Sequence, residues 1–141
     1  MDPRVENILP SGEERSVIDQ ESRLGNVARI LLAAIRCVNG AGALFAPRLL
    51  LRGLGADPAA NPAALYAFRM FGVRTLIIGI QLLLGPGEVR RQALRIAPII
   101  HASDVGAAVL AGLPARSTRT AAVISLANTV LALIAQSRSD A

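Results

Sequence analysis

Residues 24–46 read LGNVARILLAAIRCVNGAGALFA, and the distribution of polar residues in this stretch decides the fold. Arg29, Ala33, Arg36 and Gly40 follow spacings of four, three and four, so they form one stripe along a helix. Leu, Ile and Val occupy most of the remaining surface. A water-soluble amphipathic helix has the reverse arrangement, with leucine inside and charge outside. The stretch therefore predicts a helix that turns polar and small residues toward other helices and leucines toward lipid.

Three further apolar stretches follow, and proline or glycine residues separate them. We expect the helices to cover residues 24–46, 62–84, 92–113 and 117–136. At about 1.5 Å per residue each helix is roughly 30 Å long, which matches the hydrocarbon core of a bilayer. Short loops between the helices favour antiparallel neighbours. The sequence therefore predicts an all-α fold, a four-helix antiparallel transmembrane bundle over residues 23–141.

The other stretches repeat the stripe of polar and small residues. In the third stretch the stripe consists of Ala97, His101, Asp104, Ala108 and Ala111. In the fourth it consists of Ala121, Ser125, Asn128, Ala132 and Ala135. In the second, Gly72, Thr75 and Gly79 form a small-residue stripe, and Arg74 and Gln81 share another face. We expect hydrogen bonding between packed helices from four uncharged polar residues: Asn39, Gln81, Ser125 and Asn128.

Arginine is the main charged residue, and its placement is typical of a membrane protein. Residues 1–22 hold six acids and two arginines (net −4), whereas residues 23–141 hold thirteen arginines and four acids (net +9). Most of these arginines flank the apolar stretches, as they do in membrane proteins. Aromatic residues make up only 3% of the chain. Because this is too few for base stacking, we expect no nucleic-acid binding.

Segments outside the helices carry separate predictions. We expect residues 1–22 to form a short polar, acidic tail, because proline, serine and glycine at positions 10–12 interrupt it. Residues 46–55, APRLLLRGLG, fit either a short amphipathic helix at the membrane surface or an ordinary connecting loop. A partial aromatic belt is predicted near the adjoining ends of the first two helices, from Phe45, Tyr66, Phe68 and Phe71.

The arginines also predict an orientation. With the N-terminus inside, the inner side receives Arg23, Arg90, Arg91, Arg95 and Arg138. The outer side receives Arg48, Arg52, Arg116 and Arg119. Because arginine is enriched on the cytoplasmic side of membrane proteins, this small excess favours both termini in the cytoplasm. We therefore expect a multi-pass protein of the inner (plasma) membrane, with the lipid bilayer as its first partner.

A combination of residues between about positions 30 and 113 resembles a known group of proteins. The segment APRLLLRGLGADP (46–58) precedes FRMFGVRTLIIGIQLLL (68–84). The matching residues are Arg36, Pro47, Arg48, Gly55, Asp57, Arg69, Gly72, Arg74 and Asp104. This pattern is similar to small four-helix bacterial membrane proteins of unknown function that are related to the DoxX-like group. Related sequences often have Arg-Asp where this chain has Arg74-Thr75. The resemblance implies a four-helix membrane fold and no established activity.

Charged residues inside the predicted spans need partners. Asp104 is the only acid within a predicted span, and Arg36 and Arg74 are the deep cations. An unpaired buried ion is costly, and an arginine–carboxylate pair reduces that cost. A short hairpin joins the second and third helices, so we predict a salt bridge between Asp104 and Arg74. Arg36 and His101 complete the predicted buried polar cluster.

This cluster has two interpretations. It is either a structural salt bridge that fixes helix register or a relay for protons or a polar substrate, with His101 titrating near neutral pH. His101 and Asp104 alone supply too few ligands for a metal site. The chain has no phosphate-binding loop, nucleophile–base pair or redox cysteine motif. We therefore expect no enzymatic activity and no cofactor.

Two functions fit the predicted fold. The first is an accessory or structural subunit that associates with itself or with a larger membrane complex, such as a transporter. The second is a small carrier, or a membrane protein that binds a lipid or small molecule through the cluster. A cavity between the helices would favour the second function. A close-packed interior with an apolar patch on one outer flank would favour the first. A soluble regulatory bundle is a third, weaker reading.

Overall fold

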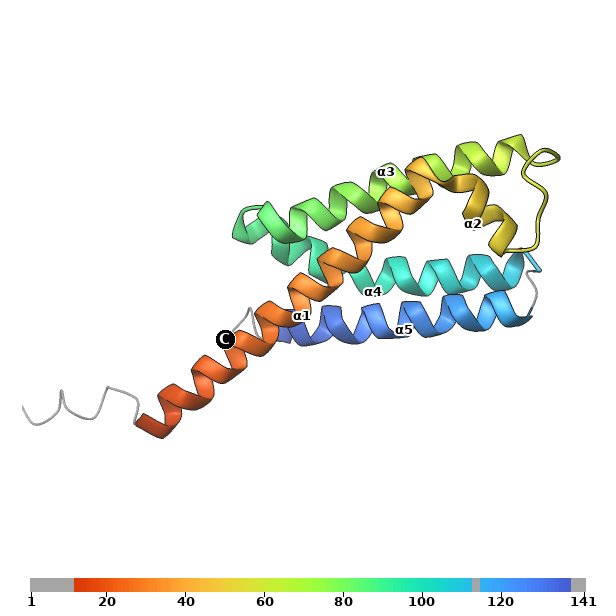
Figure 1. The fold of residues 1–141 in the computed structure, drawn as a ribbon. Coiled ribbons are helices and arrows are strands. Elements are labelled where there is room, and N and C mark those ends of the chain that lie inside the picture. Colours follow the sequence, from red (N-terminus) through yellow and green to blue (C-terminus); the bar gives the residue numbers. More distant parts are fainter. Residues whose placement is uncertain (1–11, 113–114, 138–141) are drawn as a thin grey trace, which may run out of the picture.

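The computed structural model describes residues 12–112 and 115–137, and every regular element in those ranges is a helix (Figure 1). In chain order they are α1 (Gly12–Phe45), α2 (Pro47–Gly53), α3 (Pro62–Leu84), α4 (Gly87–Leu110) and α5 (Ala115–Ser137). The all-α fold predicted from the sequence is thereby confirmed. Segments of 22–24 residues within α1, α3, α4 and α5 are long and apolar enough to cross a membrane. The structure therefore supports a multi-pass membrane protein.

Two helices begin earlier than the apolar pattern indicated. Helix α1 begins at Gly12, so the second half of the predicted tail (1–22) is helical, while residues 1–11 lie outside the described part. Glu, Gln and Arg in this segment favour helix even without an apolar stripe. Helix α4 begins at Gly87 instead of about residue 92. Its first turn contains Glu88, which suits the positive end of a helix and pairs with Arg91 at 2.6 Å.

Proline and glycine mark most of the helix boundaries that the sequence predicted. Pro47 and Pro62 each stand at the start of a helix, where a missing N–H costs nothing. The segment after Pro47 is the short helix α2, so residues 47–53 are helical and not an ordinary loop, while their position at the membrane surface stays a prediction. Gly112 follows α4 with a φ of +63°, a left-handed conformation that ends helices. Helix α4 thus ends at Leu110, three residues before the predicted end at residue 113, which itself lies outside the described residues.

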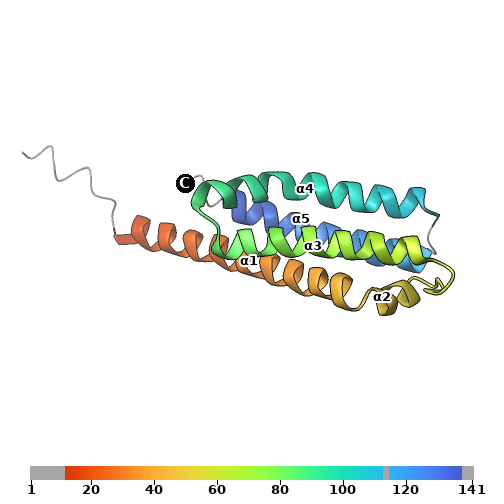
Figure 2. The ribbon, with the colours of Figure 1, turned by 90° about the horizontal axis from the view of Figure 1, so that it is seen from above.

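The four long helices form a ring in the order α1, α3, α4, α5 (Figures 1 and 2). Neighbours in the ring pack together, and the described parts of the diagonal pairs, α1 with α4 and α3 with α5, have no close backbone approach. The buried core lies in one half of the length of the bundle. It is formed by Ala28, Leu32, Ala33, Leu82, Ala93, Leu94, Ala97, Ala132 and Ala135. This half contains the α3–α4 turn and the end of α5.

Polar and aliphatic residues are distributed as in a membrane protein, which confirms the inside-out pattern. The buried polar side chains are Arg36, Thr75, His101, Ser125 and Asn128. Large aliphatic side chains face outward on all four long helices, for example Leu31, Ile77, Ile99 and Val123. In water this surface would be a large exposed apolar area around the whole bundle. In lipid it is the expected outer surface.

Helices α1 and α3 approach each other backbone to backbone. A methyl group added to Gly40 would lie 2.7 Å from the Leu76 nitrogen, and one added to Gly72 would lie 2.6 Å from the Leu44 nitrogen. Gly79 faces Cys37 along the same contact. Only glycine fits at such separations, as is common where membrane helices pack. We refer to Gly40, Gly72 and Gly79 as the α1–α3 seam. The predicted stripe of Gly72, Thr75 and Gly79 is thus a packing surface.

We predict that Gly72→Ala destabilises the bundle by about 1–3 kcal/mol, because the added methyl group forces the two backbones apart. Cys37, the only cysteine in the chain, lies against Gly79 and reports on this contact. The measurement is the temperature at which a maleimide modifies Cys37 in lipid nanodiscs. Gly42→Ala on α1 is the control, because a methyl group there meets nothing within 4 Å. Equal shifts in both variants would show that the seam does not hold α1 against α3.

Candidate functional site

Three side chains meet in the interior between α1 and α4, which face each other diagonally across the bundle. Arg36 is 3% exposed and His101 is 5% exposed. The Arg36 Nη2 atom lies 3.1 Å from His101 Nε2, and His101 Nδ1 lies 3.8 Å from Asp104 Oδ2. Arginine can only donate, so Nε2 accepts and the ring hydrogen resides on Nδ1, facing the carboxylate. The side chains form a row from Arg36 through His101 to Asp104, which we call the polar row.

The predicted salt bridge between Asp104 and Arg74 is wrong. Arg74 is exposed on the outside of α3, and the partners of Asp104 are His101 and, electrostatically, Arg36. The short α3–α4 turn explains the error. Arg74 lies ten residues before Leu84, whereas Asp104 lies seventeen residues after Gly87. In antiparallel helices this difference of seven residues separates the two along the bundle axis by about 10 Å.

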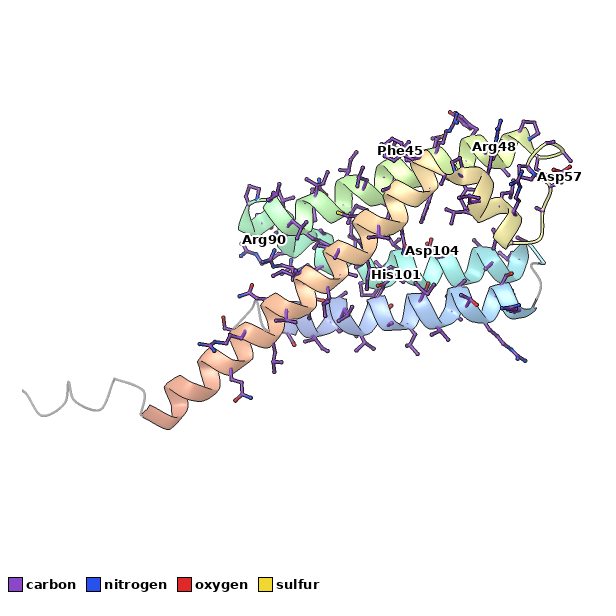
Figure 3. All side chains as sticks on the ribbon, viewed as in Figure 1. Phe45, Arg48, Asp57, Arg90, His101 and Asp104 are labelled. Atoms are coloured by element: carbon purple, nitrogen blue, oxygen red, sulfur yellow. The ribbon has the colours of Figure 1, made fainter. Side chains whose placement is uncertain are left out.

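A cavity of about 630 Å³ adjoins the polar row and opens to the outside. It lies in the half of the bundle's length away from the apolar core. Figure 1 shows that α3 and α4 diverge in this direction, from their shared turn toward α2. Its polar side is formed by Arg36, Asn39, His101, Asp104, Ser125 and Asn128. Its apolar side includes Phe68, Phe71, Ile100 and Ile124. Figure 3 shows His101 and Asp104 on α4 in this region. Cavities of roughly 300–1,000 Å³ commonly hold small-molecule ligands.

Two buried atoms beside the cavity have no hydrogen-bond partner among the described atoms. They are Arg36 Nε, a donor, and Asn128 Oδ1, an acceptor. Leaving such an atom unpaired costs about 1–3 kcal/mol. Both residues line the cavity, but these two atoms are themselves covered, so a group in the cavity pairs with them only after a small movement of the side chains around them.

The other sequence-predicted polar residues divide between the interior and the surface. Ser125 and Asn128 are buried on α5, but within the described part of the chain neither side chain forms the predicted hydrogen bond to another helix. Gln81 is half-buried on α3. Asn39 is exposed and lines the cavity, so the prediction that it packs between helices is wrong. No group of three His, Cys, Asp or Glu residues suited to a metal ion occurs among the described residues.

Two aromatic residues have a position that the sequence pattern did not indicate. Phe45 and Tyr66 are exposed, 79% and 67% respectively, as a membrane-interface belt requires. Phe68 and Phe71 line the cavity instead. Their spacing from the buried Thr75 could have predicted that they face inward, because residues 68, 71 and 75 share one face of a helix.

Comparison of the chain with protein families, with curated proteins and with solved structures finds no match. The resemblance to the DoxX-like group therefore stays a prediction. The geometry of the cavity and its polar row is therefore the evidence for function.

We predict that substitutions at Asp104 and Arg36 are energetically coupled. The two opposite charges lie on either side of His101 and attract each other. Asp104→Asn combined with Arg36→Gln should depart from additivity by about 1 kcal/mol or more in the stability measured by Cys37 modification. Asp104→Asn combined with Arg74→Gln is the control and should be additive within about 0.5 kcal/mol. Strong coupling to Arg74 and none to Arg36 would contradict the polar row.

Proposed function

We propose that this chain is an integral membrane protein that binds a small amphipathic molecule, taken from the bilayer, in the cavity between its helices. The observation that carries the proposal is the meeting of an apolar wall with two unpartnered buried atoms, Arg36 Nε and Asn128 Oδ1. A close-packed interior would have favoured the accessory subunit. The open cavity favours the carrier or binding protein.

The lining residues suggest how such a ligand lies. Its apolar part packs against Phe68, Phe71 and Ile124, and its polar group reaches Arg36 and Asn128. With a small movement of the covering side chains, Arg36 Nε donates a hydrogen bond to that group, and Asn128 Oδ1 accepts one where the group carries a hydrogen. His101 is a positioning residue, because its contact at 3.1 Å holds the Arg36 guanidinium at the cavity. The proposed role contains no chemical step, so the protein is not an enzyme in this account.

The proposal includes a location and an orientation. We place the protein in the inner (plasma) membrane with both termini in the cytoplasm. The four long helices alternate in direction, so the described start of α1 and end of α5 lie toward the same end of the bundle (Figure 2). The cavity lies toward the opposite end, next to α2. In this orientation it faces the outer half of the bilayer.

The test is a variant that fills the cavity. Ala121 lines the cavity on α5, whereas Ala127 on the same helix is exposed and does not line it. We predict that wild-type protein purified from native membranes in mild detergent carries an amphipathic molecule that mass spectrometry detects. Ala121→Phe should lower its amount about tenfold or more, because the ring occupies the ligand's space. Ala127→Phe should retain it.

Two results would overturn this function. One is a wild-type protein that carries no such molecule and does not crosslink to an aliphatic photoprobe in nanodiscs. The other is an Ala121→Phe variant that stays folded by the Cys37 measurement and retains the molecule in full.

An accessory subunit is the second candidate, and Arg74 favours it. Arg74 lies twelve residues from Pro62 and ten from Leu84, so it is near the middle of α3, and it is exposed. An arginine at mid-bilayer costs about 2.5–3.5 kcal/mol on insertion scales. A carboxylate or carbonyl group on a neighbouring transmembrane helix would remove that cost. The partner in this reading is a larger membrane complex or a further copy of the chain.

We predict for this second candidate that a photocrosslinker at Ile77, an exposed residue on α3, captures a partner in native membranes. Arg74→Leu should abolish the adduct, because it removes the charge that the partner pairs with. Arg69→Leu serves as the control, since Arg69 is exposed near the start of the same helix. An adduct that persists in Arg74→Leu, or no adduct in wild type, argues against a partner at this face.

A further inference from the structure

A second concave site lies at the other end of the bundle, beside the α3–α4 turn. It is a pocket of about 210 Å³ between α1, α4 and α5. Three arginines line it, Arg29 from α1 and Arg90 and Arg91 from α4, together with Ser22 and Asn26. Figure 3 shows Arg90 near this turn, away from His101 and Asp104. The pocket is separate from the cavity of the proposed function, because no residue lines both.

The positive charge of this pocket is only partly neutralised within the described part of the chain. Glu88 pairs with Arg91 at 2.6 Å, and its side chain is 75% exposed. Arg29 donates a hydrogen bond to the Leu82 carbonyl, which is a neutral partner. Pro86, four residues after Leu82, has no N–H, so this carbonyl lacks the usual helical donor. Arg90 acts on Arg29 as a like charge. Among the described side chains, three guanidinium groups against one carboxylate leave an excess of two positive charges around the pocket.

The start of α4 adds to the same preference for an anion. Gly87, the first residue of α4, lines the pocket, and no side chain caps this helix end. The free N–H groups of a first helical turn favour negative charge. Arg91 lies close by, since a methyl group on Gly87 would be 3.7 Å from its Nη1 atom. The arginines supply the charge, and the helix end reinforces it.

The depth of the pocket indicates which anions reach it. Its residues come from the first two turns of the α1 and α4 spans and from the last turn of the α5 span. In a bilayer these positions extend from the level of the lipid head groups into the outermost part of the hydrocarbon core. Arginine forks match the geometry of phosphate oxygens, and basic pockets between membrane helices bind phosphate-bearing head groups.

We propose that this pocket binds a phosphate group. It is supplied either by the head group of an anionic phospholipid or by free phosphate in the adjoining solution. The Arg29 and Arg90 guanidinium groups and the start of α4 bind the phosphate oxygens. Arg91 joins them by giving up part of its contact with the exposed Glu88 carboxylate. A bound phosphate group would link α1 to α4 at the end of the bundle where the core lies.

The experiment uses the full chain in mixed micelles that contain phosphatidylcholine and either cardiolipin or phosphatidylglycerol. Native mass spectrometry counts the lipids that stay bound. We expect wild type to retain the anionic lipid over phosphatidylcholine, and Arg90→Gln to reduce this retention about tenfold. Arg95→Gln is the matched control, because Arg95 lies on the same helix and does not line the pocket. Arg90→Lys should retain part of the preference, because it keeps the charge and loses the fork.

A second arm distinguishes the two sources of phosphate. Inorganic phosphate is added at constant ionic strength, with chloride as the comparison. Displacement of the anionic lipid by phosphate but not by chloride assigns the site to phosphate from either source. Retention of the lipid in both salts assigns it to the head group.

Two outcomes would overturn the inference. One is an absence of preference for anionic lipid together with an absence of phosphate binding. The other is an equal loss in Arg90→Gln and Arg95→Gln, which shows general attraction to charge. The amphipathic molecule in the cavity should be unaffected by Arg90→Gln, so failure here is distinguishable from failure of the proposed function.

Discussion

The outward-facing aliphatic side chains of the four long helices are the constraint on which the rest of the structure depends. Residues such as Ile77, Ile99 and Val123 gain nothing by leaving lipid, so they do not hold the helices together. Small residues and polar residues must do so instead. This is why alanine, serine, asparagine and a buried arginine occupy much of the interior beside a few leucines, where a soluble bundle would be filled mainly by leucine and phenylalanine.

Close packing of this kind is uneven along the bundle, and the unevenness produces the cavity. The α1–α3 seam holds the C-terminal half of α1 against α3. The N-terminal part of the α1 span packs with the end of α5 in the apolar core, through residues such as Ala28 and Ala135. Helix α1 therefore crosses from α5 to α3, and Figure 1 shows it lying obliquely over the other helices. At the end away from the core, α1 no longer fills the space between the other helices, and the polar row faces that space.

Much of the fold was predictable from the sequence because it follows from local patterns. Helix length, helix period and proline positions predicted all four spans, and the spacing of small residues predicted the α3 side of the seam but not its contact with α1. Charge rather than apolar period defines the first turns of α1 and α4, so the apolar pattern did not indicate those starts. The buried positions of Arg36 and His101 followed from their stripes, since a polar stripe on a lipid-exposed helix must face inward.

The partners within the site were harder to predict, because they depend on the register between helices. A short hairpin indicated that Asp104 and Arg74 lie on neighbouring helices, but it did not indicate their relative depth. The turn places them about 10 Å apart along the axis. Arg36 reaches His101 only because α1 faces α4 across the ring, which no local pattern predicts. The cavity likewise arises from the angles between helices, and sequence period does not encode those angles.

Spin labels can show whether lipid surrounds the aliphatic surface of the bundle. In a Cys37→Ala background, nitroxide labels are placed at Ile99 and Val123, which are exposed on α4 and α5, and at Ala59 in the loop before α3. Collision rates with oxygen and with a water-soluble nickel chelate are then measured in liposomes. The account predicts frequent oxygen collisions and rare nickel collisions at Ile99 and Val123, and the reverse at Ala59. Nickel access at Ile99 and Val123 equal to that at Ala59 would contradict it.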